Sequence, residues 1–344
     1  MRSPALSAEE KAALAQLEAR LGHLHVRQRL GLEQDYEAHV FRPGTHFFHL
    51  ENWYSIHSLI RWSLRLVGLH GRGRRNALDI RVRHHDVPIA NLPKAFDGYT
   101  LLHLSDLHVD MRADFVPALA EHIRGLDYDV CVLTGDYRAR TFGPYAATLA
   151  GMRELRAHLK EAVYGILGNH DSIRMVPGLE AMGVRMLLNE WVKIQRDGEA
   201  IYLVGIDDAH FYRVENYHRA AHDVPPEAVS ILLSHTPETY RHAAHAAFNL
   251  MLCGHTHGGQ ICLPGGTPII TDASCPRAFA RGSWRHHDMI GYTSTGAGSS
   301  IVDVRLNCPP EITLHHLRCA GPRQPPARPD SVRTVADTQP EEHA

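Results

Sequence analysis

The chain has 344 residues, of which 44% are hydrophobic, and a formal net charge of −2 at pH 7. This length allows a sizeable core in one large or two modest domains. The nearly neutral charge argues against a general nucleic-acid binder, which would need a basic groove or stripe. A membrane-spanning helix needs about 18 consecutive apolar residues, and no stretch reaches that length, so a span is not expected.

Residues 1–76 are expected to form a helical N-terminal extension. Ser7 to Glu10 resembles a capping box, in which a serine and a glutamate three residues later bond the first free amides of a helix. The helix that begins there would place Leu14, Leu17 and Leu21 on one face. The first residues lack the apolar core of a signal peptide, so we expect the protein in the cytoplasm.

A second helix is predicted over residues 52–69, with a wide apolar face. Its apolar residues recur at three- and four-residue steps: Trp53, Ile56, Ile60, Leu64 and Val67. Three arginines follow at positions 72, 74 and 75. This composition suits a helix in an anionic membrane interface, with residues 52–75 as the contact. A helix packed on the rest of the chain explains the same pattern, because an apolar face does not distinguish lipid from protein.

From residue 77 the pattern changes to strands. Leu78, Ile80 and Val82 alternate with polar residues, which predicts edge strands up to about residue 92. Five buried strands are then predicted from short apolar runs at residues 101–104, 130–133, 163–167, 231–233 and 250–253. Each is followed by one polar motif, in order Asp106-Leu107-His108, Gly135-Asp136, Gly168-Asn169-His170-Asp171, Ser234-His235 and Gly254-His255-Thr256-His257. Open α/β sheets gather ligand-binding groups at strand ends, so the motifs should meet in one site.

These residue types indicate a two-metal site. Aspartate, histidine and asparagine oxygens and nitrogens suit Mn²⁺, Fe or Zn²⁺. In an extended segment, the two-residue offset of Asp106 and His108, and of His255 and His257, would direct each pair to one side. Asp136 can bridge two cations with its two oxygens. Two cations about 4 Å apart acidify a water to a hydroxide nucleophile and take up charge on a phosphoryl group.

The order of the motifs resembles the calcineurin-like metallophosphoesterases over residues 97–317, and more closely the bacterial YkuE- and YaeI-like phosphodiesterase subgroup. Further marks of the subgroup are Thr236-Pro237 after His235, Gly258-Gly259-Gln260 after His257, and the stretch Cys308–Ile312. The resemblance implies an α+β fold: a four-layer αββα metallophosphoesterase sandwich of two mixed β-sheets flanked by helices, with the N-terminal helical extension added.

The resemblance also assigns a role to each motif residue. One metal site corresponds to Asp106, His108 and His257, and the other to Asn169, His235 and His255, with Asp136 as the bridging ligand. His170 matches the residue that donates a hydrogen bond or a proton near the scissile phosphate. Asp171 matches the residue that orients His170.

One departure from the subgroup follows Asp136. An apolar and then an acidic residue are usual there, but this chain has Tyr137-Arg138-Ala139-Arg140. The two arginines either favour an anionic substrate with charge beyond the scissile phosphate or are solvated surface residues.

The remaining elements complete the domain at residues 77–319. Helical faces are predicted at Phe115–Ile123 and Leu149–Leu159, and a second set of strands at residues 192–194, 201–204, 292–294, 301–304 and 312–317. Residues 320–344 are rich in proline and charge, which predicts a disordered tail. The six cysteines form no C-x-x-C pair, which favours a reducing compartment.

The predicted function is a dinuclear metal-dependent phosphohydrolase that uses two divalent ions and a metal-bridging hydroxide to cleave phosphodiester or pyrophosphate bonds. The arginine-rich helix favours a membrane-associated substrate, such as a phospholipid or a nucleotide-sugar lipid, and a peripheral position on the cytoplasmic face of the inner membrane. The alternative is a soluble phosphodiesterase or phosphatase for nucleotides or small phosphoesters. A non-catalytic scaffold is less favoured because every matched position keeps its residue type. No nucleic-acid partner is expected, and the oligomeric state stays open.

Overall fold

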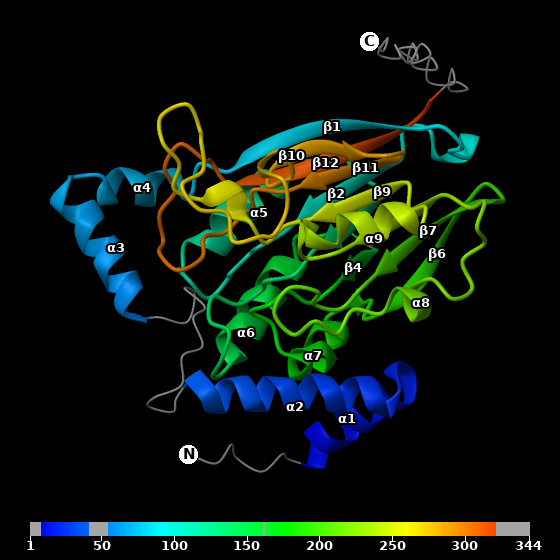
Figure 1. The fold of residues 1–344 in the computed structure, drawn as a ribbon, viewed down its shortest axis with the longest axis horizontal. Helices are drawn as coiled ribbons and strands as arrows, with labels where there is room; N and C mark the ends of the chain where they lie inside the picture. Colours follow the sequence, from blue (N-terminus) through cyan, green and yellow to red (C-terminus); the bar gives the residue numbers. More distant parts are fainter. Residues whose placement is uncertain (1–7, 41–53, 161, 321–344) are drawn as a thin grey trace, which may run out of the picture.

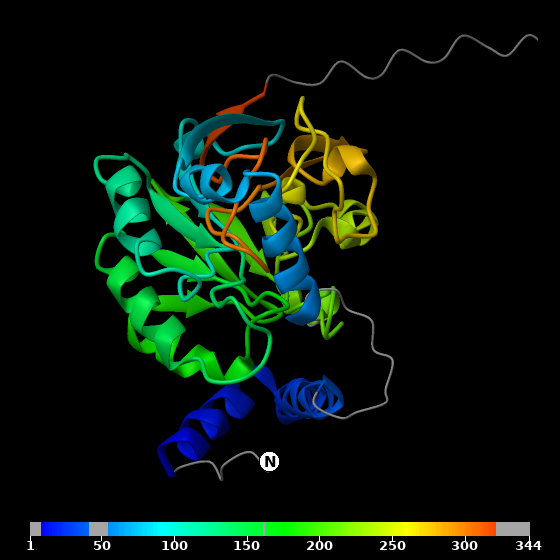
Figure 2. The ribbon, with the colours of Figure 1, turned by 90° about the vertical axis from the view of Figure 1, so that its left-hand side faces the viewer.

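A computed structural model of the chain describes residues 8–40, 54–160 and 162–320. Within these residues, two six-stranded sheets pack face to face, and helices cover the outer face of each sheet (Figures 1 and 2). The predicted αββα sandwich of two mixed sheets is therefore confirmed.

Within the described residues, each sheet is mostly parallel, with one antiparallel pair in the first sheet and an antiparallel pair at each edge of the second. The first sheet has the order β1 (Arg81–Ile89), β12 (Glu311–Cys319), β2 (Thr100–Leu104), β3 (Val130–Leu133), β4 (Val163–Gly165) and β5 (Val184–Met186). The second has the order β10 (Gly282–His286), β11 (Met289–Thr293), β9 (Leu250–Cys253), β8 (Ser230–Leu233), β7 (Glu199–Gly205) and β6 (Glu190–Arg196). Strand β12 runs antiparallel to β2, and β2, β3, β4 and β5 are parallel.

The apolar runs of the sequence become strands that are buried on both faces. Successive side chains of a strand point to opposite sides. In β9, Leu250 and Leu252 enter the core between the two sheets, whereas Met251 and Cys253 enter the core beneath the outer helices. A strand covered on both faces needs apolar residues at every position, which is why these runs are continuous.

The outer layers consist of short helices. Helices α5 (Phe115–Ile123), α6 (Ala146–Arg156) and α7 (Val176–Ala181) cover the first sheet, and α8 (Tyr217–Ala220) and α9 (Tyr240–His245) cover the second. Single 3-10 turns occur at Lys94–Phe96, Ile173–Met175, Pro237–Thr239, His257–Gly259 and Arg277–Phe279.

Two predictions for the second set of strands are wrong. Residues 301–304 form no strand. They belong to a bent segment, residues 301–306, in which Val302, Val304 and Leu306 pack against an N-terminal helix. Their apolar pattern reflects that contact and not a sheet. The strand predicted at residues 312–317 exists as β12, but it belongs to the first sheet, between β1 and β2.

The first part of the N-terminal extension is a pair of helices, α1 (Ala8–Leu21) and α2 (His23–Val40), which lie beneath α6 and α7 in Figure 1. The proposed cap residue Ser7 lies outside the described residues. Leu17, Leu21 and Val26 are buried in the same core cluster as β2 and β3. Arg20 Nη1 also lies 2.7 Å from Glu180 Oε1 of α7. These two helices therefore pack as part of the same domain as the sheets.

The second part of the extension is α3 (Tyr54–Leu66) and α4 (His70–Asn76); Asn52 and Trp53 lie outside the described residues. On one face of α3, Ile60 and Leu64 pack against the 301–306 segment. On the other face, Leu59, Trp62 and Leu66 are 60%, 61% and 70% exposed. Among the described residues, no helix is long and apolar enough to cross a bilayer. The predicted tail lies outside the described residues, apart from residue 320.

If α1 and α2 belong to the domain core, replacing Leu21 should destabilise the whole protein. Leu21 is fully buried, so Leu21→Ala should lower the free energy of unfolding by about 2–5 kcal/mol, through lost burial and the cavity left behind. Leu24, two positions beyond the helix break and 74% exposed, is the matched control, and Leu24→Ala should change stability by less than about 0.5 kcal/mol. Urea denaturation followed by circular dichroism measures both; equal effects would contradict this packing.

Candidate metal centre

The five polar motifs meet in one place. Their loops follow β2, β3 and β4 of the first sheet and β8 and β9 of the second, where the carboxyl ends of these strands come together. All nine candidate residues are buried, namely Asp106, His108, Asp136, Asn169, His170, Asp171, His235, His255 and His257. Polar groups are buried together in this number only where they satisfy one another or bind an ion.

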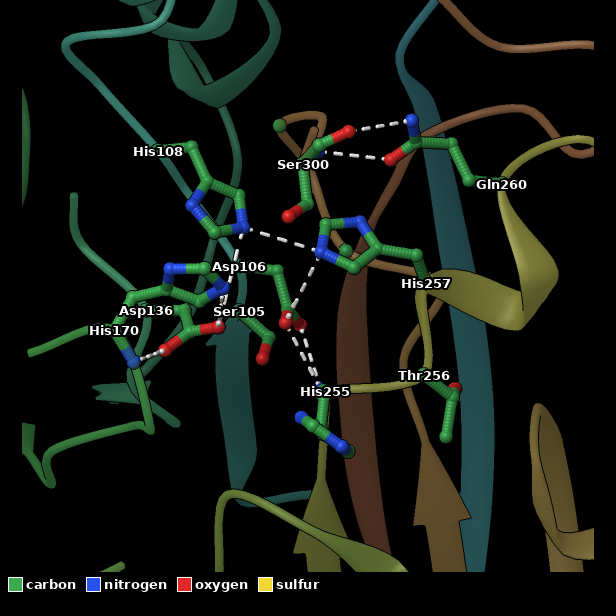
Figure 3. A network of polar contacts seen from close by, with 12 residues as sticks. Ser105, Asp106, His108, Asp136, His170, His255, Thr256, His257, Gln260 and Ser300 are labelled. Carbon is green, nitrogen blue, oxygen red and sulfur yellow. Dashed lines mark hydrogen bonds and ion pairs between the residues drawn. The ribbon is translucent and has the colours of Figure 1, made fainter. Parts of the chain in front are cut away.

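The side chains form two groups, and each has the composition of a metal site. In the first group, Asp106, His108 and His257 each offer a ligand atom within 4.8 Å of the others. The second group is formed in the same way by Asp136, His235 and His255. Figure 3 shows His108, Asp106 and His257 pointing toward one another, with Asp136 beside them. The first group has the same residues as one of the sites that the resemblance implied. The second combines His235 and His255 of the other implied site with Asp136, which the resemblance assigned as the bridging ligand.

Asp136 and Asn169 complete the arrangement. Asp136 Oδ2 lies 3.2 Å from His235 Nε2 in its own group and 4.0 Å from His108 Nε2 in the other. Asn169 Oδ1 lies 2.9 Å from both His235 Nε2 and His255 Nδ1. The Asn169 oxygen therefore joins the second group, and the Asp136 carboxylate lies between the two.

Backbone carbonyls set which nitrogen of each imidazole faces the centre. His108 Nδ1 lies 2.7 Å from the carbonyl of Arg138, and His235 Nδ1 lies 2.7 Å from that of Thr134, so both direct Nε2 inward. His255 is reversed: Nε2 lies 2.5 Å from the carbonyl of Asp272, and Nδ1 faces Asn169. Hydrogen bonds of this kind fix the tautomer and the ring orientation of metal-binding histidines.

The backbone of the ligand loops is strained. The prediction that Asp106 to His108 and His255 to His257 are extended is wrong, because these ligands have φ of 53°, 42°, 72° and 49°, and Asp136 has φ of 57°. Left-handed backbone in residues other than glycine costs about 1–3 kcal/mol each and is concentrated at functional sites. With this left-handed backbone, both side chains of each motif point toward the centre.

Two motif glycines are required by close approach to the carboxylates. A Cβ on Gly168 would lie 2.2 Å from Asp136 Oδ1, and a Cβ on Gly254 would lie 2.2 Å from Asp106 Oδ2. The backbone thus passes directly against the side chains that would hold the ions. A longer side chain at either position would displace a carboxylate.

Burial and neighbouring charges shift the pKa values of the ligands in different directions. Burial raises the pKa of Asp106. Burial would do the same to Asp136, but the charge of His235 holds the pKa of that carboxyl well below its ordinary value. Burial alone would lower the pKa of His235, but Asp136 raises it to about 10. His255 and His257 have their pKa lowered well below normal by burial, so both are neutral, as metal ligands must be.

His170 and Asp171 lie beside the ligands. His170 Nε2 is 3.9 Å from Asp136 Oδ2, and Thr141 Oγ1 is 3.1 Å from His170 Nδ1. The Asp171 carboxylate accepts hydrogen bonds from the backbone amides of Asp136 and Gly168, at 2.7 and 2.9 Å, and from that of Tyr137. Asp171 therefore connects the loop that follows β3 to the loop that follows β4. Its predicted role in orienting His170 stays a prediction.

The two arginines after Tyr137 have different environments. Arg138 is buried, and its guanidinium donates to the carbonyls of His170, Thr141 and Gly143, so neither predicted role fits this residue. Arg140 is exposed, which leaves both alternatives open for it.

Sequence patterns missed several residues that hold the centre. His210 follows β7, and its ring lies 4.1 Å from that of His255. Arg305 is fully buried, with Nη1 donating to the carbonyl of His257 at 3.0 Å and Nη2 lying 3.0 Å from its Nδ1. The position of His210 at a strand end was an available signal. Arg305 also directly follows a predicted strand, residues 301–304, but it was not singled out.

Comparison with known proteins agrees with this geometry. Residues 99–259 match the family model described as calcineurin-like phosphoesterase. Helices α1 to α4 and β1 precede the matched region.

Three relatives are similar over most of the chain. The uncharacterized metallophosphoesterase YkoQ of Bacillus subtilis (strain 168) is 27% identical over 256 residues, which cover 72% of this chain and 93% of YkoQ. YkuE of the same organism, also an uncharacterized metallophosphoesterase, is 27% identical, with 70% of this chain and 86% of YkuE covered. Phosphodiesterase YaeI of Escherichia coli (strain K12) is 27% identical, with 64% of this chain and 82% of YaeI covered.

Metal binding at the second group should release a proton. In the metal-free protein at pH near 7, His235 is protonated, because Asp136 raises its pKa to about 10. A metal needs the neutral imidazole, so metal affinity should rise about tenfold per pH unit from roughly pH 7 toward pH 10. Titration calorimetry in buffers of different ionisation enthalpy measures the protons released. The variant His235→Gln should release about one proton fewer; equal release by both proteins would contradict the assignment.

Proposed function

We propose that this chain, which matches the calcineurin-like phosphoesterase family model over residues 99–259, is a dinuclear metal-dependent phosphohydrolase that cleaves phosphodiester or pyrophosphate bonds. The observation that carries the proposal is the position of Asp136. One buried carboxylate lies within 4.0 Å of an imidazole nitrogen of each ligand group. A carboxylate in that position can be shared by two cations.

The donor set fits two divalent cations. It consists of carboxylate oxygens, imidazole nitrogens and one amide oxygen, which suits Mn²⁺, Fe or Zn²⁺. When bound, the ions supply a hydroxide nucleophile and neutralise the charge that builds on the phosphoryl oxygens. The protein orients the imidazoles of His108, His235 and His255 through hydrogen bonds to backbone carbonyl groups.

His170 would steady the phosphoryl group. Burial lowers the pKa of His170 to about 3, so its imidazole is neutral near pH 7. The Thr141 hydroxyl can donate to Nδ1, which leaves the imidazole proton on Nε2, the nitrogen that faces Asp136. A neutral imidazole in this position donates a hydrogen bond to a phosphoryl oxygen without first having to be protonated. Such an oriented donor acts on charge that develops in the transition state.

Two substitutions test the mechanism. Asp136→Asn should abolish metal-dependent hydrolysis of bis(p-nitrophenyl) phosphate, because the shared carboxylate loses its charge. His170→Ala should lower kcat by roughly 100-fold or more, which is the usual loss when one oriented donor is removed. Circular dichroism should show the fold intact in both. His287→Ala, on the exposed turn between β10 and β11, is the control and should keep full activity. Full turnover in the Asp136→Asn variant would refute the proposal.

The substrate is proposed to lie at a membrane surface. The exposed apolar face of α3 is one support, and the loop after His257 adds a second, with Leu263, Ile269 and Ile270 between 53% and 58% exposed. Both segments lie at the left-hand end of Figure 1, which faces the viewer in Figure 2. Exposed arginines at positions 65, 72 and 75 accompany α3 and would meet anionic headgroups.

These segments adjoin the metal centre. The 301–306 segment under α3 carries Arg305, which bonds His257, and the loop of residues 261–272 ends at Asp272, whose carbonyl bonds His255. Binding of both apolar segments to a bilayer would therefore bring the centre to the headgroups. A phospholipid or a nucleotide-sugar lipid fits this arrangement, with a soluble phosphodiester as the alternative.

Membrane binding is tested with vesicles of phosphatidylcholine containing phosphatidylglycerol. Burying a large apolar side chain contributes about 1.5–3 kcal/mol, so Leu59→Asp combined with Trp62→Asp should reduce co-sedimentation with the vesicles by at least about tenfold. Leu24→Asp changes a leucine on another helix that is 74% exposed, and this variant should bind as the wild type does. Wild-type protein that stays in the supernatant would favour the soluble substrate.

A further inference from the structure

Helix α2 contacts the loop that carries His170, although it lies about 140 residues away in the sequence. The contacts come from two charged residues one helical turn apart, Arg29 and Glu33. Arg29 is fully buried and Glu33 is 8% exposed. Charged side chains are seldom buried unless they are paired, so their partners indicate what they do.

Glu33 holds the residues that follow Asp171. Its Oε2 accepts a hydrogen bond from Ser172 Oγ at 2.5 Å, and its Oε1 accepts one from the Ile173 amide at 2.8 Å. Ile173 begins the 3-10 turn Ile173–Met175, so this amide is one of the free donors at the start of a helical turn. Ser172 in turn accepts from the Arg174 amide at 3.2 Å.

Arg29 bonds the same loop one residue before Ser172. Its Nη2 donates to the carbonyl of Asp171 at 2.8 Å, and its Nε lies 3.1 Å from Glu33 Oε1. Burial alone would lower the pKa of Arg29, but Asp207, Glu33 and Asp208 raise it, so the guanidinium stays charged. Its carbon Cζ also lies 3.6 Å from the ring centre of Tyr212.

Arg29 thereby joins two loops that border the metal centre. Its Nη1 is 4.0 Å from Asp208 Oδ2, and the Asp208 carboxylate accepts from the backbone amides of Phe211 and Tyr212. The same loop carries His210, whose ring contacts that of His255. A second contact between α2 and this loop runs from His25 Nε2 to Asp207 Oδ2 at 2.9 Å.

We propose that Arg29 and Glu33 are positioning residues, which hold the loop of His170 and Asp171 at the distance from the metal centre that catalysis requires. This inference rests on the proposed phosphohydrolase function. Both residues precede the region that matches the family model, residues 99–259. The reaction would thus depend on a helix that the matched catalytic region does not contain.

The effect expected from the loss of either contact is kinetic. Without Glu33, the Ile173 amide and the Ser172 hydroxyl lose their buried acceptor, and the loop that carries His170 is free to shift. Removing a residue that orients a functional group typically costs about 10- to 100-fold in activity. Glu33→Ala should therefore lower kcat about 10- to 100-fold, with KM and the bound metal per chain unchanged.

Three comparisons separate positioning from general stability. Glu33→Gln keeps an acceptor for the Ile173 amide and should retain kcat within about threefold. In a His170→Ala background, Glu33→Ala should have less than about a twofold further effect, because residues that act through one group are not additive. Arg29→Lys keeps the positive charge but loses the planar guanidinium, which reaches Asp171 and Glu33 at the same time. This variant should lower kcat as Glu33→Ala does. Arg27→Lys, at a position 71% exposed on the same helix, is its control and should match the wild type.

Hydrogen exchange gives a measurement that does not depend on activity. In the metal-loaded Glu33→Ala variant, amides of residues 168–175 should exchange faster than in the wild type, and those of β8 should not change.

If Glu33→Ala fails to fold, Arg29→Lys decides by the same measurements. Wild-type kcat and exchange in both variants would overturn the proposal. So would a full additional loss in the His170→Ala background. A wild-type enzyme without phosphodiesterase activity would instead refute the proposed function, and exchange would still test the contact.

Discussion

Two buried carboxylates, Asp106 and Asp136, are the constraint on which the rest of the structure depends. Both are essentially inaccessible to water, and an uncompensated buried charge costs several kcal/mol. In the metal-free protein the charge of Asp136 is met by protonated His235, which explains the raised pKa of that imidazole. Divalent cations would replace that proton and would also compensate Asp106. The centre is therefore organised around the cations it is proposed to bind.

The ligand loops keep their shape because other groups hold them from outside. Five of the six histidine and aspartate ligands have left-handed backbone, which the loops would not adopt if they were free. The Asp171 carboxylate joins two of the loops through backbone amides, Arg138 bonds the carbonyl of His170, and Arg305 bonds that of His257. The cores on both faces of each sheet supply the stability that offsets this strain.

The N-terminal extension contains two units that contribute in different ways. Helices α1 and α2 are packed into the domain core, and α2 bonds the loop of His170 through Arg29 and Glu33. Helix α3 packs on the 301–306 segment with one face and exposes large apolar side chains on the other. Packing on the protein and contact with lipid were alternatives for this helix on the basis of sequence, but the two faces of α3 make them compatible. The first helix pair is thus proposed to position the loop of His170, and α3 is proposed to contact a membrane surface.

The sandwich fold and the division of the ligands into two sets were implied by the resemblance of the motif order to a known family. The sequence by itself determined the five buried strands and the polar motif that follows each of them. It could do so because a strand buried on both faces is a continuous apolar run, and because each ligand directly follows such a run. Only the tertiary structure decided where β12 lies and that residues 301–304 are not a strand. It also decided that Thr141, His210 and Arg305 contact histidines of the centre, and that Arg29 and Glu33 contact the loop of His170. These residues act through partners that are distant in the sequence, as Arg29 does with Asp171. No local pattern encodes such a contact, since it exists only once the helices and loops have packed.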